Sequence, residues 1–279
     1  MSNSLLLTCQ DKLGLIYQLT EVFFQKKINI TKLEEHVELG QFFVRVQWES
    51  KEDDSKEAYQ DSLKPFCVKH NANYTLRMSK NRFKVVLLCS KPLHCLLDIF
   101  NQVKIGDLPL DIVCVISNHK TAQEFVLREQ IPFYYVPFSQ ESREAHEKEI
   151  ISILENYEYD AVGLARYMRV LSPFILSKIL RPIINVHHAF LPSFKGADPY
   201  QQAFDRGVKV IGATSHIVTE DLDEGPIIYQ DVQNVNHLAS QKQLQLLGKE
   251  SEKIVFSAAL RKQAENKIIV FRGKTIVFH

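Results

Sequence analysis

The chain has 279 residues, of which 45% are hydrophobic and 24% charged, and its formal net charge is +1. This size and composition are typical of a globular protein with one large or two smaller domains. The near-neutral charge argues against binding to nucleic acid or to an anionic membrane. We expect the five cysteines, which form no C-x-x-C pair, to be reduced thiols. With no signal peptide and no long apolar span, the sequence predicts a cytoplasmic protein without a membrane segment.

The N-terminal part of the chain predicts a small domain with the order βαββαβ. Strands are expected over residues 5–9, 29–38, 41–49 and 73–78. One helix is expected after Asp11, which we place at its N-cap, and a second over residues 55–69. This order is typical of a ferredoxin-like unit, in which helices cover one face of an antiparallel sheet. We place this domain at residues 1–80.

After a polar stretch at residues 79–82, strands and helices alternate. Continuous apolar strands such as residues 83–89 indicate burial on both faces, and therefore a mostly parallel, doubly wound α/β sheet. Further strands are expected over residues 110–116, 133–136, 160–165, 183–186, 209–219 and 226–235. A long helix over 240–265 and a hairpin over 268–278 complete this Rossmann-like domain, which we place at residues 83–279.

The densest group of polar residues follows the strand at 183–186, where ligands of a doubly wound sheet bind beyond the strand ends. Asn185 and His187 are two residues apart on an extended segment, so their side chains share a face. An amide and an imidazole placed together can donate hydrogen bonds to the oxyanion of an acyl transfer. Asp223, in a polar loop, is the candidate carboxylate to orient His187.

The same residues leave other chemistries open. His187, His216 and Asp223 could form a metal site, although no helical H-x-x-x-H motif or cysteine pair accompanies them. His216 could equally be a packed core histidine, and His188 is expected to face away from the pair. The missing G-x-S-x-G, P-loop and G-x-G-x-x-G motifs argue against serine catalysis and a nucleotide cofactor. Five other histidines are expected at the surface: His36, His70, His146, His237 and His279.

Three linked stretches, at residues 164–173, 185–197 and 212–228, resemble the folate-dependent formyltransferases, and within them the formyltetrahydrofolate deformylases. Shorter matches at residues 90–96 and 117–119 extend the likeness upstream. The N-terminal block resembles an ACT domain, the small regulatory module of these deformylases. The resemblance therefore covers nearly the whole chain.

The resemblance implies that Asn185, His187 and Asp223 are catalytic and that His216 supports them. It also implies that the folate lies against two segments of the chain. These are Met168, Arg169, Val170 and Leu171, and Val218, Thr219, Glu220, Asp221 and Leu222. No cofactor or metal is implied, because 10-formyltetrahydrofolate is itself the substrate.

Water is the formyl acceptor that the sequence favours. Glycinamide ribonucleotide formyltransferases carry a glycine-rich loop after the first strand, whereas this chain has Ser90-Lys-Pro-Leu-His94, in which Pro92 lacks a backbone donor. No counterpart of the RNA-binding extension of methionyl-tRNA formyltransferases is expected. The implied reaction is hydrolysis of 10-formyltetrahydrofolate to tetrahydrofolate and formate, which supplies formate for purine synthesis. A glycinamide ribonucleotide formyltransferase and an inactive ligand-binding protein are the alternatives.

The ACT-like block implies a homo-oligomer, either a dimer or a tetramer. It also implies a site for a small amino acid, such as glycine or methionine, near Asp11, Leu13, Gly14 and Leu15. Dimerisation without effector binding is the alternative of equal weight.

Overall fold

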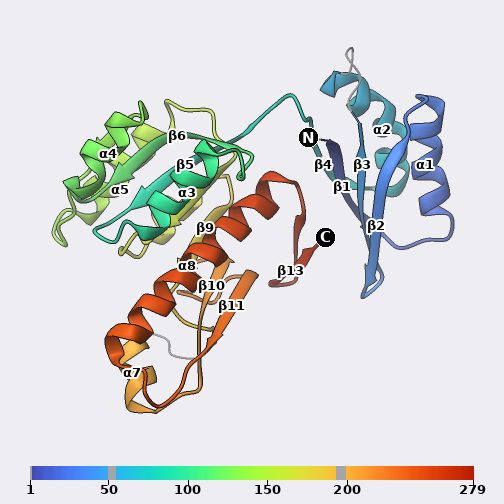
Figure 1. Cartoon of the computed structure of the whole chain (residues 1–279). Helices are drawn as coiled ribbons and strands as arrows, with labels where there is room; N and C mark the ends of the chain where they lie inside the picture. Colours follow the sequence, from blue (N-terminus) through green and yellow to red (C-terminus); the bar gives the residue numbers. More distant parts are fainter. Residues whose placement is uncertain (1, 50–54, 193–198) are drawn as a thin grey trace. The chain divides into compact units, whose positions relative to one another are not determined.

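The computed structural model describes residues 2–49, 55–192 and 199–279, which form two compact units (Figure 1). The first unit comprises Met1–Arg82, Glu265–Ile269 and Ile276–His279, and the second comprises Phe83–Ala264 and Val270–Thr275. The sequence placed residues 83–279 in one domain, but part of the C-terminal segment groups with the first unit instead. Within the described residues, no helix is both long and apolar enough to cross a membrane.

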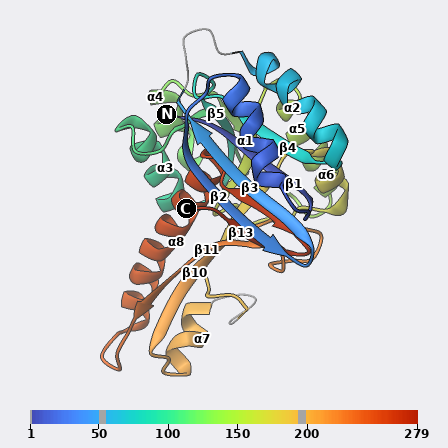
Figure 2. The same ribbon diagram turned by 90° about the vertical axis from the view of Figure 1, so that its right-hand side faces the viewer.

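The first unit is a four-stranded antiparallel sheet with two helices, which confirms the ferredoxin-like prediction. Its strands are β1 (Asn3–Gln10), β2 (Ile30–Glu38), β3 (Gln41–Trp48) and β4 (Asn73–Arg77), in the order β2-β3-β1-β4. Helices α1 (Leu15–Gln25) and α2 (Lys56–His70) lie side by side in both views (Figures 1 and 2). Alternate strand residues, including Leu5, Leu7, Val44 and Val46, pack in one core with the apolar stripe of α1, as period-2 and period-3.6 patterns require.

Two predictions about polar residues in the two units are wrong. Asp11 does not cap α1, because the helix begins at Leu15 after Gly14, whose φ of 84° suits glycine. The backbone N–H of Asp11 instead donates to the Gly40 carbonyl at 2.9 Å. His70 and His146 are buried rather than exposed, since each lies on the inward face of its helix.

The second unit is a seven-stranded, mostly parallel sheet, which confirms the doubly wound α/β prediction. Its strands are β5 (Phe83–Cys89), β6 (Leu110–Ser117), β7 (Phe133–Tyr135), β8 (Ala161–Ala165), β9 (Ile183–His187), β10 (Val210–Ile217) and β11 (Ile227–Asn234). Their order is β11-β10-β9-β8-β5-β6-β7, and the pairs that β10 makes with β9 and β11 are antiparallel. Strands such as β5 and β8 are buried on both faces, as continuous apolar runs indicate.

Helices connect these strands, and a short hairpin ends the chain. The helices are α3 (His94–Lys104), the 3₁₀ turn at Lys120–Ala122, α4 (Gln123–Arg128), α5 (Arg143–Leu154), α6 (Pro173–Lys178), α7 (Pro199–Asp205) and α8 (Gln241–Ala264). The hairpin consists of β12 (Ile268–Phe271) and β13 (Lys274–Val277).

The chain reverses direction across the sheet between β5 and β8. It runs outward from β5 through β6 to β7, and then returns to β8 on the other side of β5. The carboxyl ends of the two strands meet where Cys89 pairs with Ala165. Such a switch point opens a crevice in which ligands bind, so the segments after Cys89 and Ala165 border the expected site.

Candidate functional site

A cavity of about 390 Å³ lies at the carboxyl ends of β8 and β9. It brings together every residue that the sequence predicts for catalysis and folate binding. Its lining comprises Leu164, Arg166, Tyr167, Met168, Arg169, Val170, Leu171, Asn185, Val186, His187, His188, His216, Val218, Thr219, Glu220, Asp221, Leu222 and Asp223. Of the residues predicted for an effector, Asp11, Leu13 and Gly14 are exposed in the first unit, while Leu15 is buried.

Neighbouring strands place the amide and the histidines. Asn185 and His187 lie on β9, and the antiparallel register sets His216 of β10 directly opposite Asn185. Nε2 of His216 is 3.2 Å from Nδ2 of Asn185, and its Nδ1 is 3.0 Å from the Ile217 carbonyl. Because Nδ2 of Asn185 can only donate, Nε2 of His216 is the acceptor, and Nδ1 donates to the Ile217 carbonyl. His216 thus turns the Asn185 amide so that a second N–H stays available.

A constrained loop places the carboxylate. Asp223 has a left-handed backbone with φ 56°, which aspartate tolerates better than most residues. Gly225 lets this loop return to β10, because a Cβ there would lie 1.7 Å from the Ile217 carbonyl oxygen. Oδ2 of Asp223 is 3.2 Å from Nδ1 of His187, and Oδ1 is 3.7 Å from Nε2 of His216.

The charge at this site is fixed by the same contacts. Burial would raise the pKa of Asp223, but the hydrogen bond from Nδ1 of His187 outweighs it and holds that pKa below its usual value. Asp223 is therefore an anion. Nδ1 of His187 contacts this anion. The other ring nitrogen, Nε2, is buried without a hydrogen-bond partner among the described residues. A buried polar atom without a partner is costly, which makes Nε2 the natural contact for a ligand.

The segment after β8 is held by its backbone. Ser90 Oγ accepts from the Met168 N–H at 3.0 Å, and Arg143 donates to the Val170 carbonyl at 2.9 Å. Buried Glu147 accepts from both the N–H, at 2.9 Å, and the hydroxyl of Ser172. These contacts fix the segment while the side chains of Met168 and Val170 stay about half exposed at the cavity.

Sequence reasoning missed these supports. The sequence places Ser90 in a short match to the family and in a poor phosphate loop, but predicts no contact with the folate segment, and Arg143 and Glu147 look like ordinary charges at the start of a helix. Their partners lie 25 to 78 residues away, and no local pattern in one sequence announces such a pair.

His188, which was expected to face away from Asn185 and His187, is among the residues that line the same cavity. The strict alternation of a strand stops with β9 at His187, so it does not govern the next residue. Burial, and then the positive charges of Arg166 and His187, lower the pKa of His188 to about 4. This ring is therefore neutral at physiological pH.

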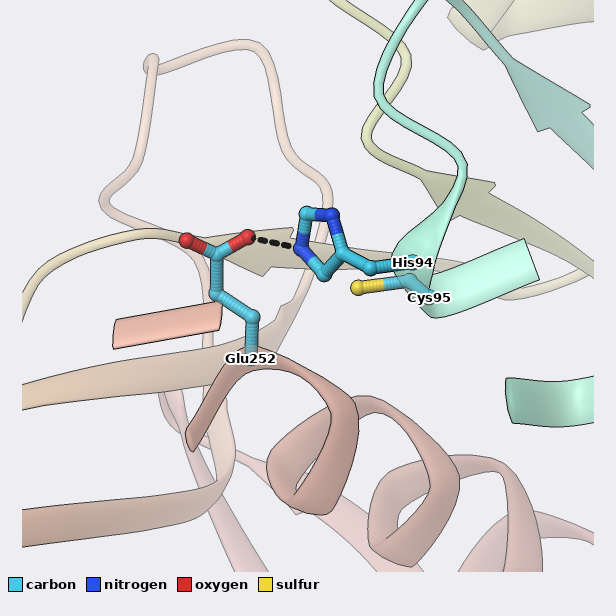
Figure 3. A group of neighbouring side chains, drawn as sticks. All are labelled: His94, Cys95 and Glu252. Carbon is cyan, nitrogen blue, oxygen red and sulfur yellow. Dashed lines mark hydrogen bonds and ion pairs between the residues drawn. The ribbon is translucent and has the colours of Figure 1, made fainter. Parts of the chain in front are cut away.

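A second polar cluster borders this cavity. Within the described part of the chain, three metal-ligating atoms come within 4.8 Å of one another at His94, Cys95 and Glu252, whereas His187, His216 and Asp223 form no such group (Figure 3). The Arg166 guanidinium lies 3.2 Å from the Glu252 carboxylate, so a cation already occupies one side of it. Burial also raises the pKa of Cys95 well above its usual value. A protonated thiol and a paired carboxylate favour a polar network over a metal site.

Comparisons with known proteins agree with this geometry. Residues 83–260 match the sequence model of a family described as formyl transferase. The chain is 38% identical to a formyltetrahydrofolate deformylase of Bacillus subtilis, covering 99% of this chain and 93% of that protein. It is 39% identical to its Escherichia coli K12 counterpart, covering 96% and 95%.

Solved structures give the same picture. The formyltetrahydrofolate deformylase of Pseudomonas syringae has a TM-score of 0.96 and 35% identity, covering 100% of this chain and 94% of that one. A glycinamide ribonucleotide transformylase of Symbiobacterium toebii has a TM-score of 0.66 and 27% identity, and it covers only 71% of this chain. The likeness over the full length, both units included, is thus to the deformylases, and this chain belongs to the formyltetrahydrofolate deformylase family.

Proposed function

We propose that the protein hydrolyses 10-formyltetrahydrofolate to tetrahydrofolate and formate, with Asn185, His187 and Asp223 as its catalytic residues. One observation carries this proposal. Nε2 of His187 is a buried donor or acceptor without a partner among the described residues, and it lines the same cavity as the Asn185 amide and the Asp223 anion. Two donors beside one anion suit a reaction in which water adds to a carbonyl group.

In the proposed mechanism, a water molecule attacks the formyl carbon. The formyl oxygen gains negative charge and is stabilised by the free N–H of Asn185 and by Nε2–H of His187. The His187–Asp223 pair takes up the proton that the water loses and returns it to N10. The bond from carbon to N10 then breaks, and tetrahydrofolate and formate leave. No other reactant is needed, so the enzyme is a hydrolase that acts on a formyl C–N bond.

The folate is proposed to bind between the two predicted segments. Met168–Leu171 and Val218–Leu222 line the cavity, so a flat ring can lie between them and accept hydrogen bonds from their backbone. The backbone of the first segment is fixed by Ser90, Arg143 and Glu147 before any ligand arrives, which lowers the entropic cost of binding.

Other parts of the expected biology stay predictions. They are a reaction without a cofactor, a cytoplasmic location, a dimer or tetramer, and control by an amino acid at an ACT domain formed by residues 1–80. Deletion of the first unit is not needed to test the last of these, because glycine or methionine can be added directly to the intact enzyme.

A formate-release assay tests the proposed function. The enzyme, pre-treated with a chelator, receives 10-formyltetrahydrofolate with or without glycinamide ribonucleotide. We expect equal amounts of formate and tetrahydrofolate, at a rate that glycinamide ribonucleotide does not change. Faster consumption of the formyl donor with that acceptor would favour the transferase, and activity that returns only with zinc or iron would favour the metal alternative.

A further inference from the structure

The crevice at the switch point between β5 and β8 is filled by the protein itself. Glu252 of α8 is 1% exposed and lies at the centre of a polar network. Its Oε2 is 2.6 Å from Nε2 of His94 and 3.2 Å from Nε of Arg166, and its Oε1 accepts from the Tyr200 hydroxyl at 2.6 Å. Figure 3 shows Glu252 reaching from α8 to His94 at the start of α3, with the Cys95 sulfur beside them.

The sequence makes room for this network at a cost. Gly248 precedes Glu252 by one turn of α8, and a Cβ there would lie 2.0 Å from the Tyr200 hydroxyl oxygen. A glycine inside a helix is less favourable than alanine, because its backbone loses more conformational freedom on folding. At this position the missing side chain leaves the space in which the Tyr200 ring reaches the Glu252 carboxylate.

The network adjoins the catalytic residues. Arg166 and His188 line the cavity as well as the network. The centroid of the His188 ring is 5.0 Å from that of the His187 ring and 6.1 Å from that of the Tyr200 ring. Apart from the catalytic residues, most of the remaining cavity lining belongs to the two folate segments. An acceptor other than water would therefore have to reach the formyl carbon past Arg166 and His188.

We propose that Tyr200, Glu252 and His94 block the acceptor side of the formyl site, so that only water reaches the formyl carbon. This inference rests on the proposed hydrolysis. A water molecule fits into a very small space, whereas even a small primary amine such as glycinamide needs part of the crevice that this network fills. Doubly wound folds commonly bind ligands in the crevice at this position. Here side chains fill that crevice, so larger acceptors are excluded sterically and water is selected.

The test measures where the formyl group goes. Enzyme and 10-formyltetrahydrofolate are incubated with glycinamide, and the ratio of N-formylglycinamide to formate is measured. The wild-type enzyme should give formate almost alone. Tyr200→Ala should raise the ratio at least about tenfold, because it empties the space of a whole ring. Tyr200→Phe keeps the ring and should stay close to wild type, which separates lost bulk from a lost hydroxyl.

A second variant covers the chance that Tyr200→Ala does not fold. His94→Ala opens the same network from α3, where the histidine side chain is 16% exposed. An unchanged product ratio in a folded variant that still releases formate would overturn the inference. A wild-type enzyme that releases no formate would instead overturn the proposed function.

Discussion

Asp223 combines an anionic charge with a left-handed backbone, and both properties shape a test of its role. Asparagine tolerates the same φ of 56°, so Asp223→Asn removes the charge without forcing the loop to move. We expect turnover to fall by about 10²–10⁴, the usual size of a lost acid–base group, with little change in folate affinity. Formate release and the Kd for tetrahydrofolate measure the two effects.

Asp107→Asn is the matched control, because this carboxylate is exposed and lies outside the cavity. It should behave as wild type in both assays. Near-normal turnover in Asp223→Asn would remove Asp223 from the mechanism.

His188 gives the site a measurable pH dependence. Its pKa is about 4 in the folded protein and about 6.5 in an unfolded chain. Between these values the unfolded state binds a proton that the folded state does not, so stability is lost as the pH falls from about 7 to 4. The loss from this ring is up to about 3 kcal/mol. The free energy of unfolding, measured with urea at pH 7.5 and at pH 4.5, should therefore fall less in His188→Phe than in the wild type, because phenylalanine cannot titrate. Parallel losses in the two proteins would contradict this.

The catalytic residues could be predicted from local signals, and their supports could not. Asn185 and His187 share a face because of strand periodicity, and Asp223 stands in a polar loop. The position of His216 depends on the register between β9 and β10, which aligns it with Asn185. The pattern within a single strand does not determine its register with a neighbouring strand. The sequence alone therefore could not decide whether His216 belongs to the core or to the site.

Helix α5 acts on the folate site through its first turns. Glu147 accepts two hydrogen bonds from Ser172 and lies 3.4 Å from Arg143, which in turn holds the Val170 carbonyl. Glu147→Gln replaces an acceptor-only group by one that must also donate, so the segment at 168–172 should loosen. We expect KM for 10-formyltetrahydrofolate to rise roughly 3- to 30-fold with kcat much less affected, because the loss is of binding rather than of chemistry.

Glu149→Gln is the control for that substitution. Glu149 lies two residues further along the same helix and is exposed. Its KM should equal that of the wild type. A fall in kcat with unchanged KM in Glu147→Gln would contradict the positioning role of α5.

Most elements were predictable because their apolar patterns are strong. The expected strands and helices agree with the structure to within a few residues at each end, as for β5 and for the long helix α8. The start of α1 was missed, because a left-handed Gly14 opens this helix instead of a side-chain cap. A parallel sheet was also predictable from buried strands, but the antiparallel pairing of β10 and β11 depends on contacts across the sheet.

At the scale of the molecule, the C-terminal segment departs most from expectation. Arg45 of β3 donates to the carbonyls of Asn266 and Glu265, each at 2.9 Å, just after α8 ends. These partners are 221 and 220 residues apart in sequence, so composition and periodicity could not reveal that they group together.

Arg45 should therefore be important for the stability of the first unit. The side chain is 1% exposed, its NH1 lies 3.8 Å from Glu34, and burial lowers its pKa although Glu34 and Glu265 raise it. Arg45→Met fills similar space, but it leaves the carbonyls of Glu265 and Asn266 without this donor and removes the ion pair with Glu34. We expect a loss of about 2–4 kcal/mol in the free energy of unfolding.

Trp48 makes this loss measurable, because it is the one tryptophan of the chain and is fully buried in the core of the first unit. Its fluorescence during urea unfolding therefore reports on that unit. Lys32→Met is the control, since Lys32 also binds a backbone carbonyl, that of His279, but its side chain is 44% exposed. An exposed contact of this kind is worth less than about 1 kcal/mol, so its transition should move little. If the Trp48 transition of Arg45→Met coincides with that of wild type, the buried guanidinium does not stabilise this unit.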